Sequence, residues 1–333
     1  MTHSTKATER ESSAWAWHPN LPLPAAPVWV WPPQPVNAAK YLIGEGFVWS
    51  TASLFVSLAV LSWFVLLPTA DQWASLAWEW VLQVLAVNTA LMVFVAGGLH
   101  WRLYTRRHQG QNKKFEDRDL SHSSAKFLFN NQVHDNVFWS LVSGIPICTA
   151  MQVIVMWAYA NGVAPWLYWS DHPILFVLAF PLIAMWSSMH FYWIHRLIHW
   201  PPLFKRVHAL HHRNINIGPW SGISMHPVEH FLYFSTIFVH LVVATHPIHL
   251  FYHVYLQFLS PPCTHSGFSE LTVKGRKLVS LGDFFHQLHH RYFDCNYGTA
   301  IMPWDRWFGS FHDGTEAATS RVREYQRQRR GTA

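Results

Sequence analysis

The sequence predicts an all-α integral membrane protein with a helical cap outside the membrane. Half of the 333 residues are hydrophobic and 13% are charged, compared with about a quarter in soluble domains. Long charge-free stretches recur along the chain, and each can cross about 30 Å of hydrocarbon as a helix. The mean hydropathy of +0.06 indicates a sizeable aqueous part beside these stretches. We expect about four transmembrane helices, a membrane-embedded hairpin and a cytoplasmic helical cap.

The N-terminal third predicts an arm followed by a membrane hairpin. Residues 1–46 are polar at first and then rich in proline and tryptophan, which disfavours a regular helix and predicts an extended arm. Residues 47–67 and 76–99 are two apolar stretches joined by a short turn, and we expect a transmembrane helical hairpin. The loop at 100–126 carries seven basic residues against three acidic ones, so it should face the cytoplasm by the positive-inside rule.

Two further spans and an interrupted apolar segment follow. Residues 137–160 and 173–189 predict the third and fourth spans, and the segment between them has no lysine or arginine. Residues 230–260 carry no charge but are too long for one untilted span, and His246-Pro247 interrupts them. We therefore expect a membrane-embedded hairpin at this place.

These features divide the chain into four parts. They are an arm at 1–46, a transmembrane hairpin with its basic loop at 47–119, a motif-bearing domain at 120–312 and a basic tail at 313–333. The tail predicts a solvated helix, with contact to anionic lipid as the alternative. No turn signal typical of a β-hairpin stands out, which favours the all-α fold.

Composition also argues against some classes of function. The net charge of +6 is modest, its basic residues gather in loops, and no nucleic-acid-binding motif is present, so we expect no nucleic-acid partner. Cys148, Cys263 and Cys295 are widely scattered, which predicts neither disulfides nor a Cys-x-x-Cys site. The chain lacks a Gly-rich dinucleotide fingerprint, so redox chemistry would need electrons from a separate protein.

Three histidine motifs are the strongest signal in the chain. They read His195-x3-His199, His208-x2-His211-His212 and His286-x2-His289-His290. Residues three and four apart share one face of a helix, and neutral imidazole is a common ligand for transition metals. Eight imidazoles exceed the needs of one ion and predict a two-metal site. Because the chain has 24 histidines, the alternative is that they are ordinary core or surface residues.

These motifs resemble the histidine boxes of the fatty acid hydroxylase / sterol desaturase superfamily of membrane di-iron oxygenases. The resemblance covers about residues 120–312. The connecting text fits as well: Phe191 to Arg196, Met225 to Glu229, His265-Ser266-Gly267, Asn296-Tyr297-Gly298 and Trp304-Asp305-Arg306. It implies two iron ions (Fe2+/Fe3+), O2, a lipid or other hydrophobic substrate, and a cytochrome b5-like or ferredoxin electron donor with its reductase. By the same resemblance, His226 and His265 join the eight motif histidines as ligands.

Several further residues are candidates around these ligands. Metal-bound histidine usually donates its other N–H to a carboxylate or carbonyl, and the carboxylates near the motifs compete with helix capping for that role. The candidates are Glu229, Asp283 and Asp305, with Asn296 as a holder of a metal-bound water. The polar group Asn130, Asn131, Gln132, His134 and Asp135 is a second source of hydrogen bonds to the imidazoles. His190 points about 140° away from His195 on a helix and is expected to be peripheral, whereas ligation by His230 stays open.

The resemblance predicts an O2-dependent enzyme that hydroxylates or desaturates a C–H bond of a sterol, fatty acyl chain or similar lipid. Two alternatives stay open: a histidine-rich membrane protein that binds or transports metal, and a zinc protein of the same fold without oxygenase activity. We expect the metal site to face the cytoplasm. A bacterial inner membrane is favoured over the endoplasmic reticulum.

Overall fold

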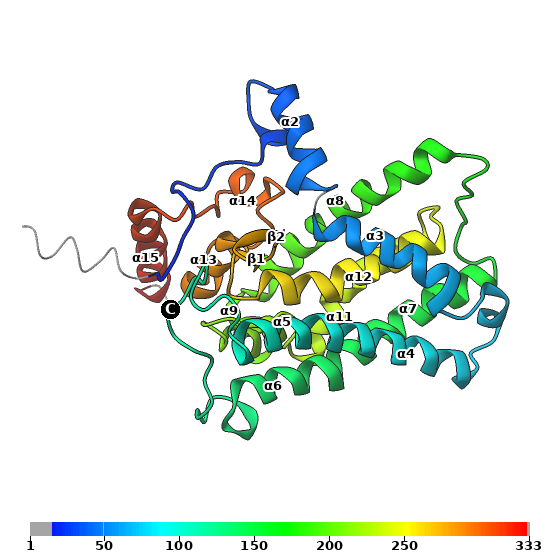
Figure 1. The fold of residues 1–333 in the computed structure, drawn as a ribbon, viewed down its shortest axis with the longest axis horizontal. Coiled ribbons are helices and arrows are strands. Elements are labelled where there is room, and N and C mark those ends of the chain that lie inside the picture. The colour runs from blue at the N-terminus through cyan, green and yellow to red at the C-terminus, as the bar shows by residue number, and fades with distance from the viewer. Residues whose placement is uncertain (1–14, 49, 332–333) are drawn as a thin grey trace, which may run out of the picture.

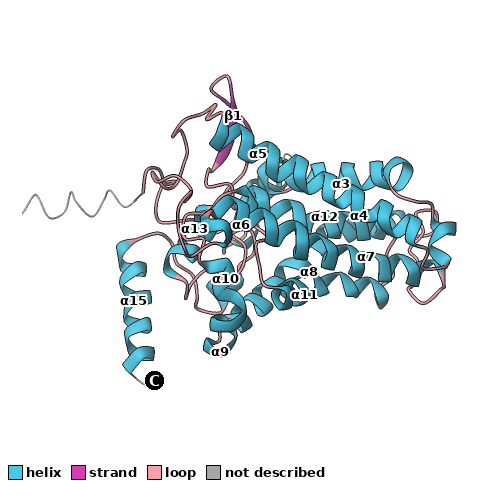
Figure 2. Ribbon diagram, turned by 90° about the horizontal axis from the view of Figure 1, so that it is seen from below, coloured by secondary structure: helices cyan, strands magenta, loops and turns pink. Residues whose placement is uncertain are grey.

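The computed structural model describes residues 15–48 and 50–331, and it is mostly helical (Figure 1). Three helical stretches are long and apolar enough to cross a membrane, Trp78–Thr105, Gln132–Ala160 and Pro173–Ile198. A fourth candidate is a bent pair, Pro35–Gly46 with Thr51–Leu66. The long helices run side by side at one end of the molecule, and the cap lies at the other (Figures 1 and 2). The expected all-α membrane architecture is confirmed.

The helices have the following bounds. They are α2 (Pro35–Tyr41), α3 (Thr51–Leu61), α4 (Trp78–Met92), α5 (Gly98–His100), α6 (Gln132–Trp139), α7 (Ile145–Ala160), α8 (Pro173–Ile198), α9 (Pro201–Leu203), α10 (Ala209–His212), α11 (Pro227–Phe234), α12 (Pro247–Thr264), α13 (Phe284–Tyr292), α14 (Trp304–Trp307) and α15 (Glu316–Gly331). Short 3-10 or π segments connect several of them, among them η2 (Leu42–Gly46), η9 (Phe204–His208) and η11 (Ser235–Leu241).

Helix α12 forms the centre of the bundle. It packs against α3, α7 and α8, and most of its side chains are buried. The expected hairpin at 230–260 is therefore a chain reversal, formed by α11, η11 and α12. It breaks at His246, whose side chain caps α12 by accepting a hydrogen bond from the Ile248 amide. This packing brings the end of α12 to the end of α8, where the cap begins.

Two local predictions from the sequence need correction. Strands β1 (Glu270–Val273) and β2 (Arg276–Ser280) form an antiparallel hairpin. Its turn residues Lys274 and Gly275 both have positive φ, as a two-residue β-hairpin turn requires. The second correction is α2, because Pro35 occupies the first turn of a helix, where proline is tolerated.

Apart from a short 3-10 helix, η1 (Pro27–Trp29), the described arm before α2 is extended, and it is fastened to the cap. The Ala16 amide donates to the Phe115 carbonyl at 2.9 Å, and the Leu23 amide donates to the Asp313 carbonyl at 2.8 Å. The basic tail forms α15, whose Gln326 Nε2 donates to the Tyr292 carbonyl at 2.7 Å. Both ends of the described chain therefore support the cap, while the first 14 residues lie outside the described part.

Candidate metal centre and its cavity

Nine of the ten predicted ligands come together in two groups of buried histidines. Group A contains His195, His199, His208, His212 and His289, and group B contains His211, His265, His286 and His290. Within each group, the nitrogens available for coordination all lie within 4.8 Å of one another. The structure thus brings nine of the predicted residues together and adds how they divide between the two groups.

Each His-x-x-His-His motif serves both groups. In the second motif His208 and His212 belong to group A and His211 to group B; in the third, His286 and His290 belong to group B and His289 to group A. On a helix the residue at i+4 lies about 40° from residue i, whereas the residue at i+3 lies about 60° away on the other side. The motif therefore points two imidazoles at one site and the third at its neighbour.

Oxygen acceptors fix the orientation of several of these rings from behind. His195 Nδ1 donates to the Tyr297 carbonyl at 2.6 Å, and His289 Nδ1 donates to the Cys295 carbonyl at 2.6 Å. His265 Nδ1 lies 3.0 Å from the Pro261 carbonyl. A carbonyl only accepts, so Nδ1 carries the proton and Nε2 presents a lone pair to the interior of the group.

The Nε2 atoms of neighbouring rings face one another at contact distance. The distances are 3.1 Å for His195–His208, 3.2 Å for His199–His212, 3.0 Å for His212–His289, 3.0 Å for His265–His286 and 3.1 Å for His265–His290. Ligands about 2.1 Å from one ion are about 3.0 Å apart at right angles and about 3.4 Å apart in a tetrahedron. The spacing therefore fits cations with more than four ligand positions.

Burial keeps the imidazoles neutral and hence able to coordinate. It lowers the pKa of His211 to about 4, with only a partial offset from the Ser224 carbonyl. Burial, followed by the neighbouring imidazoles, lowers the pKa of His199, His208, His212, His265, His286, His289 and His290 well below the usual value. Neutral imidazole is the form that binds a metal ion.

Glu229 supplies the carboxylate behind one ring. Its Oε1 accepts from His208 Nδ1 at 2.7 Å, while Oε2 has no partner among the described residues. Burial raises the pKa of Glu229 well above its usual value. An imidazole held in this way is oriented, and its coordinating nitrogen becomes more basic.

The other three candidates act further from the groups. Asp283 caps α13 by accepting from the Phe285 amide at 2.9 Å. Asp305 accepts from the amides of Tyr297 and Gly298 at 2.8 and 2.7 Å, and so holds the carbonyl that accepts from His195. The Asn296 side chain bonds to backbone groups of Phe285 and His312, which fastens α13 and does not support the predicted role with a metal-bound water.

Three histidines that the sequence analysis considered, His226, His230 and His190, lie outside both groups. His226, the tenth predicted ligand, caps α11, and its Nδ1 accepts from the Val228 amide at 3.2 Å. His230 lies between Ser143 Oγ and the Ile223 carbonyl, at 3.0 and 2.9 Å. His190 Nε2 lies 3.1 Å from Ser235 Oγ. A proline directly after His226 favours the start of a helix, and this places His226 at the cap position.

Comparison with known proteins supports the same assignment. The fatty acid hydroxylase family model matches residues 180–310, which include all nine grouped histidines. Residues 180–310 belong to the fatty acid hydroxylase family. No solved structure matches the chain.

Curated relatives of this hydroxylase-family region have sterol-related names. A Δ(7)-sterol 5(6)-desaturase of Aspergillus fumigatus is 28% identical over 59% of this chain and 58% of its own length. A Δ(7)-sterol 5(6)-desaturase of Gibberella zeae is 33% identical over 39% of this chain and 40% of its own. Lathosterol oxidase of Mus musculus is 33% identical over 38% and 42%. The chain thus spans about half the length of these relatives.

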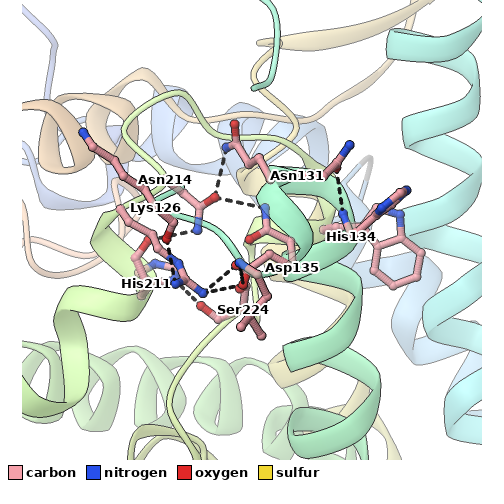
Figure 3. A network of polar contacts seen from close by, with 12 residues as sticks. Lys126, Asn131, His134, Asp135, His211, Asn214 and Ser224 are labelled. Atoms are coloured by element: carbon pink, nitrogen blue, oxygen red, sulfur yellow. Dashed lines mark hydrogen bonds and ion pairs between the residues drawn. The ribbon is translucent and has the colours of Figure 1, made fainter. Parts of the chain in front are cut away.

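A polar network on α6 holds the second motif of the hydroxylase-family region from outside (Figure 3). Asn214 Oδ1 accepts from Gln132 Nε2 at 2.9 Å and from Asn136 Nδ2 at 3.0 Å, and its Nδ2 donates to the His211 carbonyl. Arg213 contacts both carboxylate oxygens of Asp135 at 2.6 Å. The polar residues near 130–135 thus bind the residues after the motif rather than the imidazoles. Asn214 gave no signal in the sequence beyond its place directly after the motif.

An apolar cavity of about 660 Å³ reaches both histidine groups of the hydroxylase-family region. It meets His195 and His208 of group A and His211, His265 and His286 of group B. One face of α8, from Pro181 to Ile198, lines it over about 25 Å, and α12 lines the opposite side. The volume lies within the usual range for small-molecule sites. Residues between 28 and 48, together with Ala52, also contribute to the wall, although the family match begins at residue 180.

Proposed function

We propose that this protein is a membrane-bound non-haem di-iron oxidoreductase that hydroxylates or desaturates a C–H bond of an elongated lipid, using O2 and external electrons. The observation that carries the proposal is the shared cavity, which is apolar along its length and ends on imidazoles from both groups. A lipid lying along α8 would place one part of its chain beside both candidate metal sites.

The donor set fits two iron ions. Group A offers five imidazoles and group B four, and the neighbouring Nε2 atoms are 3.0–3.2 Å apart. This spacing is shorter than about 3.4 Å, the value for a tetrahedral zinc site. When bound, a pair of irons supplies the electron transfer to O2 that removal of hydrogen from an unactivated C–H bond requires.

The chain itself would position the substrate and keep water away. Phe191, Ile194 and Ile198 line the cavity next to His195 and surround a reacting carbon with apolar side chains. Excluding water from such a site prevents side reactions. The hydrogen bonds from His195 to Tyr297 and from His208 to Glu229 keep the two rings directed at their site.

Sidedness, electron supply and host membrane are also part of the proposal. The basic loop at 100–126 favours a cytoplasmic cap, where a cytochrome b5-like protein or a ferredoxin with its reductase could deliver electrons. The relatives named above are fungal and mouse proteins and therefore give no support to a bacterial inner membrane. Metal transport is disfavoured because the nine grouped histidines lie together at the ends of α8 and α12 and on η9, α10 and α13, rather than along the spans.

The relatives' names make a sterol with a Δ7 double bond the first substrate to test. Purified protein in lipid nanodiscs would be incubated with lathosterol, a reductase-coupled cytochrome b5 or ferredoxin, and ¹⁸O2. A product lighter by two hydrogens without ¹⁸O would show desaturation, and one ¹⁸O atom in the product would show hydroxylation. A panel of sterols and fatty acyl lipids would follow. If the protein holds both metals and no lipid on the panel changes in an O2-dependent way, the proposal fails.

A further inference from the structure

Most polar side chains in the cavity are already hydrogen-bonded to one another. Ser187 Oγ donates to Gln257 Oε1 at 2.8 Å, and Ser188 Oγ lies 2.9 Å from Thr299 Oγ1. Such pairs leave little capacity for a polar group of the substrate. A polar recognition site must therefore come from groups in the wall that lack such partners.

Besides Glu229 Oε2, two tyrosine hydroxyls of the cavity wall have no hydrogen-bond partner in the described part of the chain: Tyr252, whose hydroxyl is buried, and Tyr41. They lie at different ends. Tyr252 is 13 residues before His265 on α12, which corresponds to about 20 Å. Tyr41 ends α2 and lines the cavity together with Asp283, which is three residues before His286 of group B. The Tyr41 hydroxyl thus belongs to the metal end of the cavity.

Asp283 is the acceptor that accompanies Tyr41. It lines the same cavity, and its position is fixed because it caps α13 through the Phe285 amide. Its carboxylate also accepts a hydrogen bond from the Ala300 amide. A carboxylate has several acceptor positions, and the two amides leave some of them free.

The ring of Tyr41 is held in place by its surroundings. A Cβ added at Gly46 would lie 2.5 Å from Tyr41 Cε1, so the ring packs directly on the Gly46 backbone. Glu45 contacts Lys277 and Ser280 of β2, three residues before Asp283. Upstream, Trp29 Nε1 donates to the Ile301 carbonyl at 2.9 Å. These contacts hold the arm against the cap on both sides of Tyr41.

We propose that Tyr41 and Asp283 bind a hydroxyl group of the lipid substrate at the metal end of the cavity. A hydroxyl both donates and accepts, so it can donate to the Asp283 carboxylate and accept from the Tyr41 hydroxyl. The inference rests on the proposed function and makes it more specific. The substrate is an elongated hydrophobic alcohol whose hydroxyl lies near the carbon that reacts. The recognition residues come from the arm and the first turn of α13, and Tyr41 lies outside the family match.

The test measures binding rather than turnover. The fluorescent sterol dehydroergosterol and its methyl ether, which cannot donate a hydrogen bond, are titrated into full-length protein in nanodiscs at pH 7.5. Energy transfer from tryptophan reports binding. Wild-type protein should bind the alcohol about tenfold more tightly than the ether, as expected for a hydrogen bond to a charged group. Equal binding of the two probes, or no binding, would overturn the proposal.

Single substitutions test whether Tyr41 and Asp283 cause the preference for the alcohol. Tyr41→Phe and Asp283→Asn should each reduce the preference for the alcohol over the ether to about threefold or less. Asparagine can still cap α13, so the fold of Asp283→Asn is retained. Gly46→Ala should act like Tyr41→Phe because it displaces the ring. Tyr252→Phe is the matched control, a cavity tyrosine at the other end, and should keep the full preference. Loss of the preference in Tyr252→Phe alone would place the hydroxyl at the wrong end and contradict the proposal.

Metal content and O2-dependent turnover are measured on the same samples. A clear preference for the alcohol without turnover would reject the oxygenase proposal and leave the hydroxyl site in place. Turnover without any preference for the alcohol would reject the hydroxyl site alone.

Discussion

The Nε2 atoms of His195 and His208 lie 3.1 Å apart, although each ring directs its Nδ1 at an oxygen acceptor, Tyr297 O or Glu229 Oε1. When both Nδ1 atoms are protonated, which for His208 requires an ionised Glu229, both facing nitrogens carry lone pairs and no proton is available for a hydrogen bond between them. A cation between the two nitrogens relieves this repulsion. The arrangement therefore suits a metal site better than a hydrogen-bonded histidine pair in the core.

Removing the carboxylate of Glu229 should weaken metal binding in group A. Glu229→Ala leaves His208 without an acceptor for Nδ1, and loss of such outer partners typically costs about 10–100-fold in metal affinity. Glu229→Gln should cost less, because its amide oxygen can still accept. The chelator concentration that removes half of the metal measures the effect. Equal metal retention in wild-type and Glu229→Ala protein would show that the contact does not support the site.

Gly222 should tolerate no side chain. A Cβ there would lie 2.4 Å from the carbonyl carbon of Pro261, whose oxygen accepts from His265. Gly222→Ala must move backbone at the end of α12, and we expect a loss of about 1–3 kcal/mol together with weaker metal binding. Thermal unfolding in detergent measures the first effect. Gly98→Ala is the control, since nothing lies within 4 Å of its added Cβ, and its melting temperature should not fall.

His312 should make stability depend on pH. It accepts from the Gly314 amide through Nδ1 at 3.0 Å, and burial lowers the pKa of His312 to about 4. The unfolded chain, with a histidine pKa of about 6.5, takes up this proton first as the pH falls. The contribution of neutral His312 is therefore present above about pH 6.5 and is lost toward pH 4, by at most about 1.4 kcal/mol per pH unit.

His312→Gln isolates this contribution from those of the other histidines. The difference in unfolding free energy between wild type and the variant should shrink as the pH falls from 6.5 to 4. Denaturant titrations in detergent at several pH values provide the measurement. A difference that stays constant over this range would mean that His312 does not titrate on unfolding.

The sequence predicted the clustering of nine histidines because they are periodic, but it could not predict how they divide between the two groups. The sequence analysis assigned the histidines of each motif to one helix face. In the structure, His211 and His289 belong to the other group than the rest of their motifs, and this depends on how α10 and α13 face each other. His226 had the right residue type but lies at a helix cap. The acceptors Tyr297 O and Cys295 O are backbone atoms, and side-chain patterns carry no information about them.

The sequence also did not predict the contacts between segments that lie far apart in the chain. The prolines of the arm predicted an extended segment, yet α2 begins at Pro35 and carries Tyr41 into the wall of the cavity. The β1–β2 hairpin was missed because its turn is Lys274-Gly275 rather than one of the common pairs with asparagine or aspartate. The membrane helices were predicted well, since their length and lack of charge follow from the thickness of the bilayer.

The central claim is tested most directly by the metal content of detergent-purified protein, with Mössbauer spectra of iron-57-labelled samples. Wild type should hold about two irons per chain, one in each group. His289→Ala should deplete group A, His265→Ala should deplete group B, and each should leave about one iron. His226→Ala is the matched control and should keep both. Metal that survives unchanged in both group variants, or that is lost in His226→Ala, would contradict the two-group centre.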